Sequence, residues 1–293
     1  MKAAERQTRF PGIHRGPALR AAGYKVRAEN PRKDKNMKLS DVKAIVTGGA
    51  SGMGRAFTLG LAAAGSDVVA CDISAAGLAE TIDAAKELPG SVYGLEVDVT
   101  QEEQVQGLIA DAEEALGGLN VLVNNAGIFL DSKLVSVDRE TGKVRKSMSL
   151  DQWNRVIDVD LTGPFLCTRE FAINHIDRRS GSEAVVVNMS SVSRHGNPGQ
   201  TNYSAAKAGL VADTKLWALE MARYGLRFGA IAPGFVQTPI LDGMPPEVLK
   251  KLTSVVPLKR VGTTDEILLA VKFIIECGYF TGRCIDIDGG FTP

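Results

Sequence analysis

The stretch Lys43–Gly54, KAIVTGGASGMG, decides how this chain folds. A short β-branched run, 43–47, leads directly into a loop whose glycines Gly48, Gly52 and Gly54 are spaced GxxxGxG, and a helical pattern follows. Glycines permit a tight turn at such a junction and let another group approach the backbone closely. The start of the helix offers unpaired N–H groups and the positive end of the helix dipole. The stretch therefore predicts the first strand, loop and helix of a parallel α/β sheet.

The rest of the chain repeats this alternation of short apolar runs and longer helical patterns. Further strands are expected at 67–71, 92–97, 119–123, 184–189, 226–231 and 284–287. Helical patterns lie near 53–64, 75–87, 101–116, 151–178, 203–223 and 264–277. Strands separated by helix-length segments pair in parallel through right-handed crossovers. The predicted fold is α/β, a doubly wound parallel sheet of the Rossmann-like kind, in a single domain over 37–293.

Two segments depart from the alternation. Residues 130–150 contain a turn signal at 139–143 between two partly alternating arms, which predicts a small surface hairpin. Residues 233–262 carry five prolines, too many for one regular element, so we expect a substrate loop or lid there.

The first 36 residues differ in composition from the rest. They hold 10 Lys and Arg against 3 acids, which leaves 24 against 31 for residues 37–293. The basic segment has no apolar periodicity, so it is interpreted as a disordered N-terminal extension, and Met37 follows it directly. A transit peptide and a nucleic-acid-binding arm are weaker alternatives. The mildly acidic remainder argues against nucleic acid as a partner.

Composition also restricts where the protein works. No apolar run approaches the ~20 residues that span a bilayer, so no membrane role is expected. The 4 cysteines and 3 histidines show no metal-ligand spacing, and no metal site is predicted. Scattered thiols in a chain of this length favour a reducing compartment, and the expected location is the cytoplasm.

The glycine-rich loop and the end of the second strand together predict a dinucleotide site. The loop, which includes Ser51 and Met53, would hold a pyrophosphate at the helix N-terminus. Asp72 ends the second strand, where an acidic side chain accepts hydrogen bonds from ribose hydroxyls and repels a 2′-phosphate. No basic residue stands at Ser51 or Ile73, so NAD is favoured over NADP. A helix cap is the alternative role for Asp72, although Ser74 is available for it.

Tyr203 and Lys207 form the candidate acid–base pair. Four residues apart on a helix, they share one face. A phenol has a pKa near ~10, and an ammonium group favours its anion. At ~4 Å and an effective dielectric of ~20, that charge contributes ~4 kcal/mol, about three pKa units. The expectation is a Tyr203 pKa close to neutrality, where a general acid–base works best.

Taken together, the motifs resemble those of the short-chain dehydrogenase/reductase family over about 40–293. The ordered matches are Thr47-Gly48-x-x-x-Gly52-x-Gly54, Asp98-Val99, Asn124-Asn125-Ala126-Gly127, Ser191, Tyr203-x-x-x-Lys207, and Pro233-Gly234 followed by Thr238. The resemblance implies hydride transfer between NAD(H) and a secondary alcohol or ketone. It also implies a homo-tetramer or homo-dimer that acts on a small molecule.

The resemblance further implies roles for single residues. Lys207 would hold the nicotinamide ribose, and Ser191 would hold the reacting oxygen. Ser191 is preferred to Ser190 because the family's Asn-x-x-Ser spacing runs from Asn188.

Cofactor contacts carry over in the same way, as expectations. They are Asp98 and Val99 for the adenine; Asn125, Ala126 and Gly127 for the nicotinamide side; and Val236 and Thr238, after Pro233, for the carboxamide.

One position departs from the family pattern. Asp160, in Asp160-Leu161-Thr162-Gly163, stands where the family usually has Asn. The family's Asn binds a water linked to the catalytic Lys. A carboxylate there would bring a negative charge near Lys207, or it would be a structural substitute without consequence.

Three alternatives stay open at this level. The segments 196–200 and 256–258 resemble 3-oxoacyl-(acyl-carrier-protein) reductases, which usually prefer NADP. Arg194 and His195 would contact an anionic substrate or form an exposed loop. A non-catalytic NAD-binding regulator would lack Ser191, Tyr203 or Lys207, and all three are present.

Overall fold

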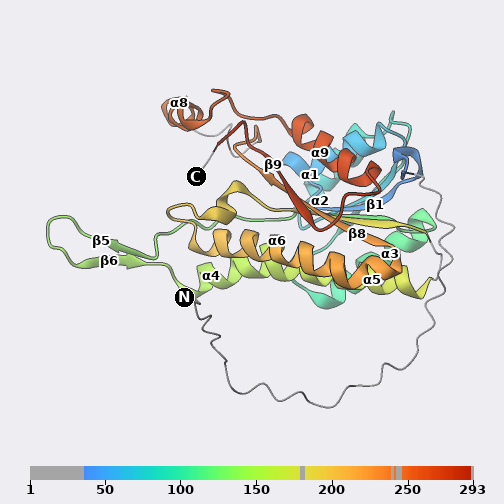
Figure 1. Ribbon diagram of the computed structural model, residues 1–293, viewed down its shortest axis with the longest axis horizontal. Coiled ribbons are helices and arrows are strands. Elements are labelled where there is room, and N and C mark those ends of the chain that lie inside the picture. Colours follow the sequence, from blue (N-terminus) through green and yellow to red (C-terminus); the bar gives the residue numbers. More distant parts are fainter. Residues whose placement is uncertain (1–35, 179–181, 239–240, 242–245, 292–293) are drawn as a thin grey trace, which may run out of the picture. The chain divides into compact units, whose positions relative to one another are not determined.

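Seven parallel strands form the central sheet in the order β3-β2-β1-β4-β7-β8-β9 (Figure 1). Their bounds are β1 Lys43–Thr47, β2 Asp67–Asp72, β3 Val92–Glu96, β4 Val121–Asn124, β7 Ala184–Met189, β8 Leu226–Pro233 and β9 Arg283–Ile287. The computed structural model describes residues 36–178, 182–238, 241 and 246–291. All seven predicted strands are present, so the predicted doubly wound sheet is confirmed. The predicted disordered extension lies outside the described residues except for its last residue.

Helices cover both faces of the sheet (Figure 1). The bounds are α1 Gly52–Ala62, α2 Ala75–Ala84, α3 Glu102–Leu116, α4 Leu150–Ile157, α5 Gly163–Asp177, α6 Thr201–Met221, α8 Pro246–Val255 and α9 Thr264–Glu276. The short turns are Leu39–Asp41, Val192–His195 and Ala222–Tyr224. One core packs α3 and α5 against the sheet, and the other packs α1 and α9 against its opposite face. The strands β4, β7 and β8 are buried along their whole length, as apolar runs between two helical layers should be.

A π-helical turn interrupts the single helix expected over 151–178. Residues Asp158–Thr162 adopt this wider turn between α4 and α5. Pro164, in the first turn of α5, has no N–H to donate, and its ring clashes with the carbonyl four residues earlier, that of Asp160. We attribute the wide turn to this proline, and the sequence analysis missed it. Inserted turns of this kind occur frequently at functional sites.

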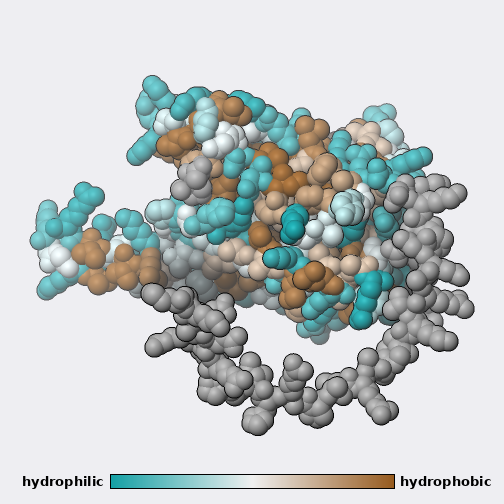
Figure 2. Space-filling view, in the orientation of Figure 1, coloured by the Kyte–Doolittle hydropathy of each residue, from teal (hydrophilic) through white to brown (hydrophobic). Residues whose placement is uncertain are grey.

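The predicted hairpin at 130–150 is confirmed. Strands β5 (Val135–Val137) and β6 (Val144–Ser147) pair antiparallel, and Asp138 N–H donates to the Lys143 carbonyl across the turn at 2.9 Å. The hairpin projects beyond the main sheet (Figure 1), and Figure 2 shows apolar side chains along it.

The segment 233–262, where a substrate loop or lid is expected, contains the helix α8 (Pro246–Val255). The prolines do not prevent this helix. Pro246 stands at its first position, where a missing N–H costs no hydrogen bond, and Pro257 follows its end. Residues 239–240 and 242–245 of the predicted substrate loop lie outside the described residues.

Candidate active site

A cavity of about 580 Å³ lies at the carboxyl ends of the strands. The strand order reverses between β1 and β4, and parallel α/β sheets bind ligands in the crevice that such a reversal opens. Most of the predicted site residues line this cavity: Gly48, Ser51, Gly52, Met53, Asp72, Asn125, Ala126, Gly127, Asp160, Ser191, Tyr203, Lys207, Pro233, Val236 and Thr238.

The three loop glycines have different physical roles. Gly48 and Gly52 have positive φ angles of 69° and 53°, which favour glycine. A Cβ on Gly54 would stand 2.0 Å from the Gly48 carbonyl oxygen, so Gly54 lets α1 pack against the loop rather than lining the cavity. A Cβ on Gly52 would instead make an ordinary contact with Thr238 Cγ2 at 3.8 Å.

The N-terminus of α1 can receive an anion. Ser51 occupies the N-cap position, but its side chain makes no capping hydrogen bond. The first N–H groups of a helix lack partners within the helix, and here they begin at the loop that lines the cavity. This end of the cavity fits a pyrophosphate.

Asp72 lies at the carboxyl end of β2 and lines the same end of the cavity. Its carboxylate accepts hydrogen bonds from Ala50 N–H at 3.1 Å and from Ser74 N–H at 3.0 Å. Ser74 is the cap of α2, since its hydroxyl accepts from Gly77 N–H at 3.2 Å. Asp72 is therefore held at a fixed place by the loop after β1, with the cap role filled by its neighbour.

Thr47 joins the ends of β1 and β4. Its hydroxyl accepts hydrogen bonds from Asn125 N–H and Ala126 N–H, both at 3.0 Å. The Asn125 amide donates back to the Thr47 carbonyl at 3.0 Å. Asn125 therefore fixes the loop beside the cavity.

The two residues expected from the resemblance to contact the adenine do not line the cavity. The cavity lining includes neither Asp98 nor Val99. The Asp98 carboxylate accepts from Thr100 N–H at 2.9 Å and from the Thr100 hydroxyl at 2.7 Å, while Val99 is buried in the core. The structure gives both residues a structural role, and their contact with a cofactor stays a prediction.

Ser191, Tyr203 and Lys207 come together in the wall of the cavity. All three are buried, and Ser191 lies close enough to Tyr203 for its hydroxyl to lower the pKa of the phenol. The Lys207 ammonium lies 5.4 Å from the centre of the Tyr203 ring and donates to the Met189 carbonyl at 3.0 Å. Ser190 donates instead to the Lys207 carbonyl at 2.9 Å, which supports the choice of Ser191.

Asp160 pairs directly with Lys207. Its Oδ2 lies 3.1 Å from Lys207 Nζ, and its Oδ1 accepts from Ile128 N–H at 2.8 Å. The π-helical turn carries this carboxylate, which is fully buried. Gly127 leaves space for the pair, since a Cβ there would stand 2.9 Å from Asp160 Oδ2.

This pairing changes the acid–base balance expected from the sequence. Burial is the largest influence on Tyr203 and raises its pKa; Lys207 lowers it, and Asp160 raises it again. The net direction is upward, so the expectation of a Tyr203 pKa near neutrality is wrong for the protein alone. Burial lowers the pKa of Lys207, but Asp160 and Tyr203 raise it by more than burial lowers it. The net pKa of Lys207 is raised, and the ammonium stays charged. The sequence analysis counted the lysine and omitted burial.

The far wall of the cavity contains residues that the sequence analysis missed. The Phe129 ring packs 4.6 Å from the Tyr203 ring, centre to centre, and Asp131 follows it. Gln200 donates from Nε2 to the Asp131 carboxylate at 3.0 Å. The available signal was position, because residues just after Asn124–Gly127 follow a strand at the carboxyl edge of the sheet.

Arg194 does not face this cavity. It forms an ion pair with Asp286, Nη2 to Oδ1 at 2.7 Å, and His195 is exposed. This pairing disfavours a contact between Arg194 and an anionic substrate, and that contact stays a prediction.

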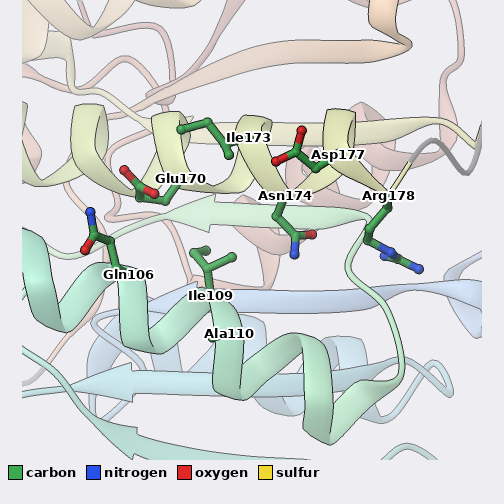
Figure 3. Close-up of a pocket in the computed structure, with 8 residues that line it drawn as sticks. All are labelled: Gln106, Ile109, Ala110, Glu170, Ile173, Asn174, Asp177 and Arg178. Carbon is green, nitrogen blue, oxygen red and sulfur yellow. The ribbon is translucent and has the colours of Figure 1, made fainter.

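A second, shallower cavity of about 430 Å³ lies between α3 and α5 (Figure 3). Ile109 and Ile173 face each other across it, and Arg178 closes one end through an ion pair with Glu113 at 3.0 Å. It contains none of the predicted site residues. Within the described ranges, no group of three His, Cys, Asp or Glu could hold a metal ion.

The sequence profile of the family described as Enoyl-(Acyl carrier protein) reductase matches residues 48–292. The chain belongs to the short-chain dehydrogenase/reductase family. It is 39% identical over 259 residues to the 3-oxoacyl-(acyl-carrier-protein) reductase FabG of Thermotoga maritima, covering 87% of this chain and 100% of that protein. It is 33% identical to the human (3R)-3-hydroxyacyl-CoA dehydrogenase over 264 residues, covering 86% and 96% of the two chains.

A solved structure agrees with this placement. A protein from Sinorhizobium meliloti 1021 assigned as a short-chain alcohol dehydrogenase is similar with a TM-score of 0.74 and 30% identity, covering 85% of this chain and 95% of that one. Membership of the short-chain dehydrogenase/reductase family confirms the predicted class of enzyme, an oxidoreductase that transfers a hydride between a nicotinamide cofactor and a secondary alcohol or ketone. None of the described helices is long and apolar enough to cross a membrane.

Proposed function

We propose that this short-chain dehydrogenase/reductase is an NAD-dependent alcohol dehydrogenase or ketone reductase in which Tyr203 is the general acid–base. The observation that carries the proposal is the buried contact of Tyr203 with Ser191 and Lys207 in a cavity whose other end holds Asp72 and the N-terminus of α1. A nicotinamide cofactor bound along this cavity would accept a hydride from the substrate carbon, or return one. Gly52, Asp72, Lys207 and Thr238 are the residues that would hold it.

The residues of the chain supply the proton and the orientation. Ser191 and Tyr203 would both hydrogen-bond the reacting oxygen, which fixes the substrate carbon. In ketone reduction the Tyr203 hydroxyl donates its proton to that oxygen, and in alcohol oxidation the phenolate accepts the hydroxyl proton. Because the Tyr203 pKa lies above its usual value, the proton-donating form dominates at neutral pH. Oxidation should therefore accelerate toward alkaline pH.

Asp72 supports NAD rather than NADP. Its carboxylate lines the cavity beside the loop that begins α1, and a 2′-phosphate there would meet a fixed negative charge. Arg55, which lies near in sequence, is already engaged by the Ala50 carbonyl at 2.6 Å and by Glu80 at 2.7 Å. Arg55 is therefore not free to attract the 2′-phosphate of NADP.

The substrate and the assembly are further parts of the proposal. Two relatives are named for 3-oxoacyl and 3-hydroxyacyl thioesters, which makes an acyl-thioester reductase the second candidate. We also propose a homo-oligomer in the cytoplasm that acts on a small molecule.

Two matched assays test the proposal. Tyr203→Phe keeps the ring but removes the proton donor, so turnover should fall by ~10²–10⁴-fold while NAD binding is retained. Turnover near that of the wild type would contradict the assigned role. Wild-type activity with NAD should exceed that with NADP by at least ~tenfold, or ~1.4 kcal/mol, and Asp72→Ala should narrow the ratio. Equal use of both cofactors by the wild type would overturn the NAD assignment.

A further inference from the structure

We propose that Asp131, held by Gln200, forms a hydroxyl-binding subsite that selects substrates with a second hydroxyl beside the reacting carbon. This inference rests on the proposed function, because the cavity it concerns is the proposed active site. The subsite lies in the same cavity as Tyr203, on the wall formed by the segment after β4 and the loop before α6.

The orientation of the Gln200 amide is fixed by its neighbours. Its Oε1 accepts hydrogen bonds from the Ser193 hydroxyl at 2.8 Å and from Asn197 Nδ2 at 2.9 Å. A flipped amide would place Nε2 against the Asn197 donor, so Nε2 must face Asp131. It does so at 3.2 and 3.0 Å from the two carboxylate oxygens. Gln200 is buried, so this donor is fixed in the cavity wall.

The backbone around Asp131 is fixed as well. Ser132 N–H donates to the Gly199 carbonyl at 2.8 Å, and Asn202 Nδ2 donates to the Leu130 carbonyl at 3.3 Å. The backbone is thus held on both sides of Asp131, whose side chain is exposed to solvent and lines the cavity. Its charge contributes to the raised pKa of Tyr203, after burial and Asp160, so it lies within electrostatic reach of the phenol.

Asp131 retains unused acceptor capacity. A carboxylate offers about four lone-pair positions, and among the described residues only Gln200 donates to it. No described ion pair includes Asp131, and the single cation in the cavity lining, Lys207, is paired with Asp160. Residues 239–245, PILDGMP, contain no Lys or Arg.

These charges define the class of substrate. A carboxylate or phosphate near the reacting carbon would be repelled by Asp131, since Lys207, the one cation among the described lining residues, is paired with Asp160. A hydroxyl can donate to Asp131 while Ser191 and Tyr203 hold the reacting oxygen. A hydrogen bond to a charged group contributes enough to change kcat/KM by at least about tenfold.

The test compares alcohols that differ in one group. Butan-2-ol, butane-2,3-diol, 3-aminobutan-2-ol, 3-hydroxybutyrate and its methyl ester are assayed with NAD, and the binding of each to NADH-saturated protein is measured by calorimetry. We expect kcat/KM for the diol to exceed that for butan-2-ol by at least about tenfold. The kcat/KM for the methyl ester should exceed the kcat/KM for the anionic 3-hydroxybutyrate. Asp131→Asn should bring the ratio of kcat/KM for the diol to kcat/KM for butan-2-ol close to one, and this ratio cancels any change in Tyr203 that affects both alcohols alike.

Asp138→Asn is the matched control. It removes one carboxylate from the turn of the hairpin that follows Asp131, and Asp138 is not among the residues that line the cavity. It should leave the diol preference unchanged. Equal kcat/KM and binding for diol and butan-2-ol, or a diol preference that survives Asp131→Asn, would overturn the subsite. An amino alcohol preferred to the diol would replace the hydroxyl assignment with a cationic one. Selective diol binding without turnover of any alcohol would support the subsite and overturn the proposed function.

Discussion

Replacing Asp160 by Asn tests the electrostatics of the proposed active site most directly. Asp160 Oδ2 lies 3.1 Å from Lys207 Nζ, which lies 5.4 Å from the centre of the Tyr203 ring. The carboxylate oxygen is therefore within ~8.5 Å of the ring centre, and at an effective dielectric of ~20 a charge at that distance contributes ~2 kcal/mol, or ~1.4 pKa units, against the phenolate. Asn has nearly the same shape and removes this charge.

The sign of the effect follows from the pKa directions. Burial raises the pKa of Tyr203, Lys207 lowers it and Asp160 raises it, so Asp160→Asn should lower it. Lys207 loses its counter-charge at the same time, its own pKa falls, and this offsets part of the gain. We expect the acidic limb of the pH profile for alcohol oxidation to move down by about one pH unit, with substantial turnover retained.

The assay is the pH dependence of kcat and kcat/KM for oxidation of one secondary alcohol with saturating NAD, between pH 6 and 11. Asp158→Asn is the matched control, because Asp158 occupies the same π-helical turn but is exposed. That variant should leave the limb in place. An unmoved limb in Asp160→Asn with normal turnover would refute the reasoning and leave Asp160 as a structural substitute for the family's Asn.

Three further outcomes are expected. Gly54→Ala should destabilise the protein by ~1–3 kcal/mol, because its Cβ would stand 2.0 Å from the Gly48 oxygen. Gly107→Ala in α3 should stabilise the protein by up to ~1 kcal/mol, because no heavy atom lies within 4 Å of the added Cβ. Urea unfolding measures the free energy of unfolding of both variants, and equal effects would contradict the packing argument. A chain that begins at Met37 should keep its melting temperature and turnover, since residues 1–36 show no apolar periodicity; a fall of several degrees would show that the segment is docked. The pKa values of Tyr203 and Lys207 are both raised by folding, so their contribution to stability is complete below the unfolded values near ~10 and is lost as pH rises through the folded ones. The urea midpoint should therefore fall above pH ~10, less steeply in Tyr203→Phe, and a midpoint that is level to pH 11 would exclude this linkage.

Local pattern was sufficient for most of the fold and for the chemically distinctive residues. Strand 184–189 was predicted to the residue, because a strand buried on both faces is an unbroken apolar run between two polar boundaries. Tyr203 and Lys207 were found because a helix places residues four apart on one face, and Asp72 because it ends a strand beside the glycine loop. The first two of these predictions depend on residues a few positions apart, and the third on residues 18 positions apart within one strand–helix–strand unit.

Other features depended on contacts between distant segments. The five prolines of 233–262 predict that the segment is not one regular element, but they do not reveal the helix α8, which begins at Pro246 and ends before Pro257. From Lys207 alone, the pKa of Tyr203 is expected to lie close to neutrality. Its pKa depends as well on burial by several elements and on Asp160, 43 residues earlier. Asp131 gained a candidate role only because Gln200, 69 residues later, points its amide at it.

The sequence alone thus determined the parallel sheet, the glycine loop and the residues that can carry a proton, since these follow from periodicity and residue type. The tertiary structure decided which of those groups share a low-dielectric cavity, and therefore which charge states they favour. Electrostatic energy depends on the distance between charges and on their exclusion from water, and neither can be read from spacing along the chain.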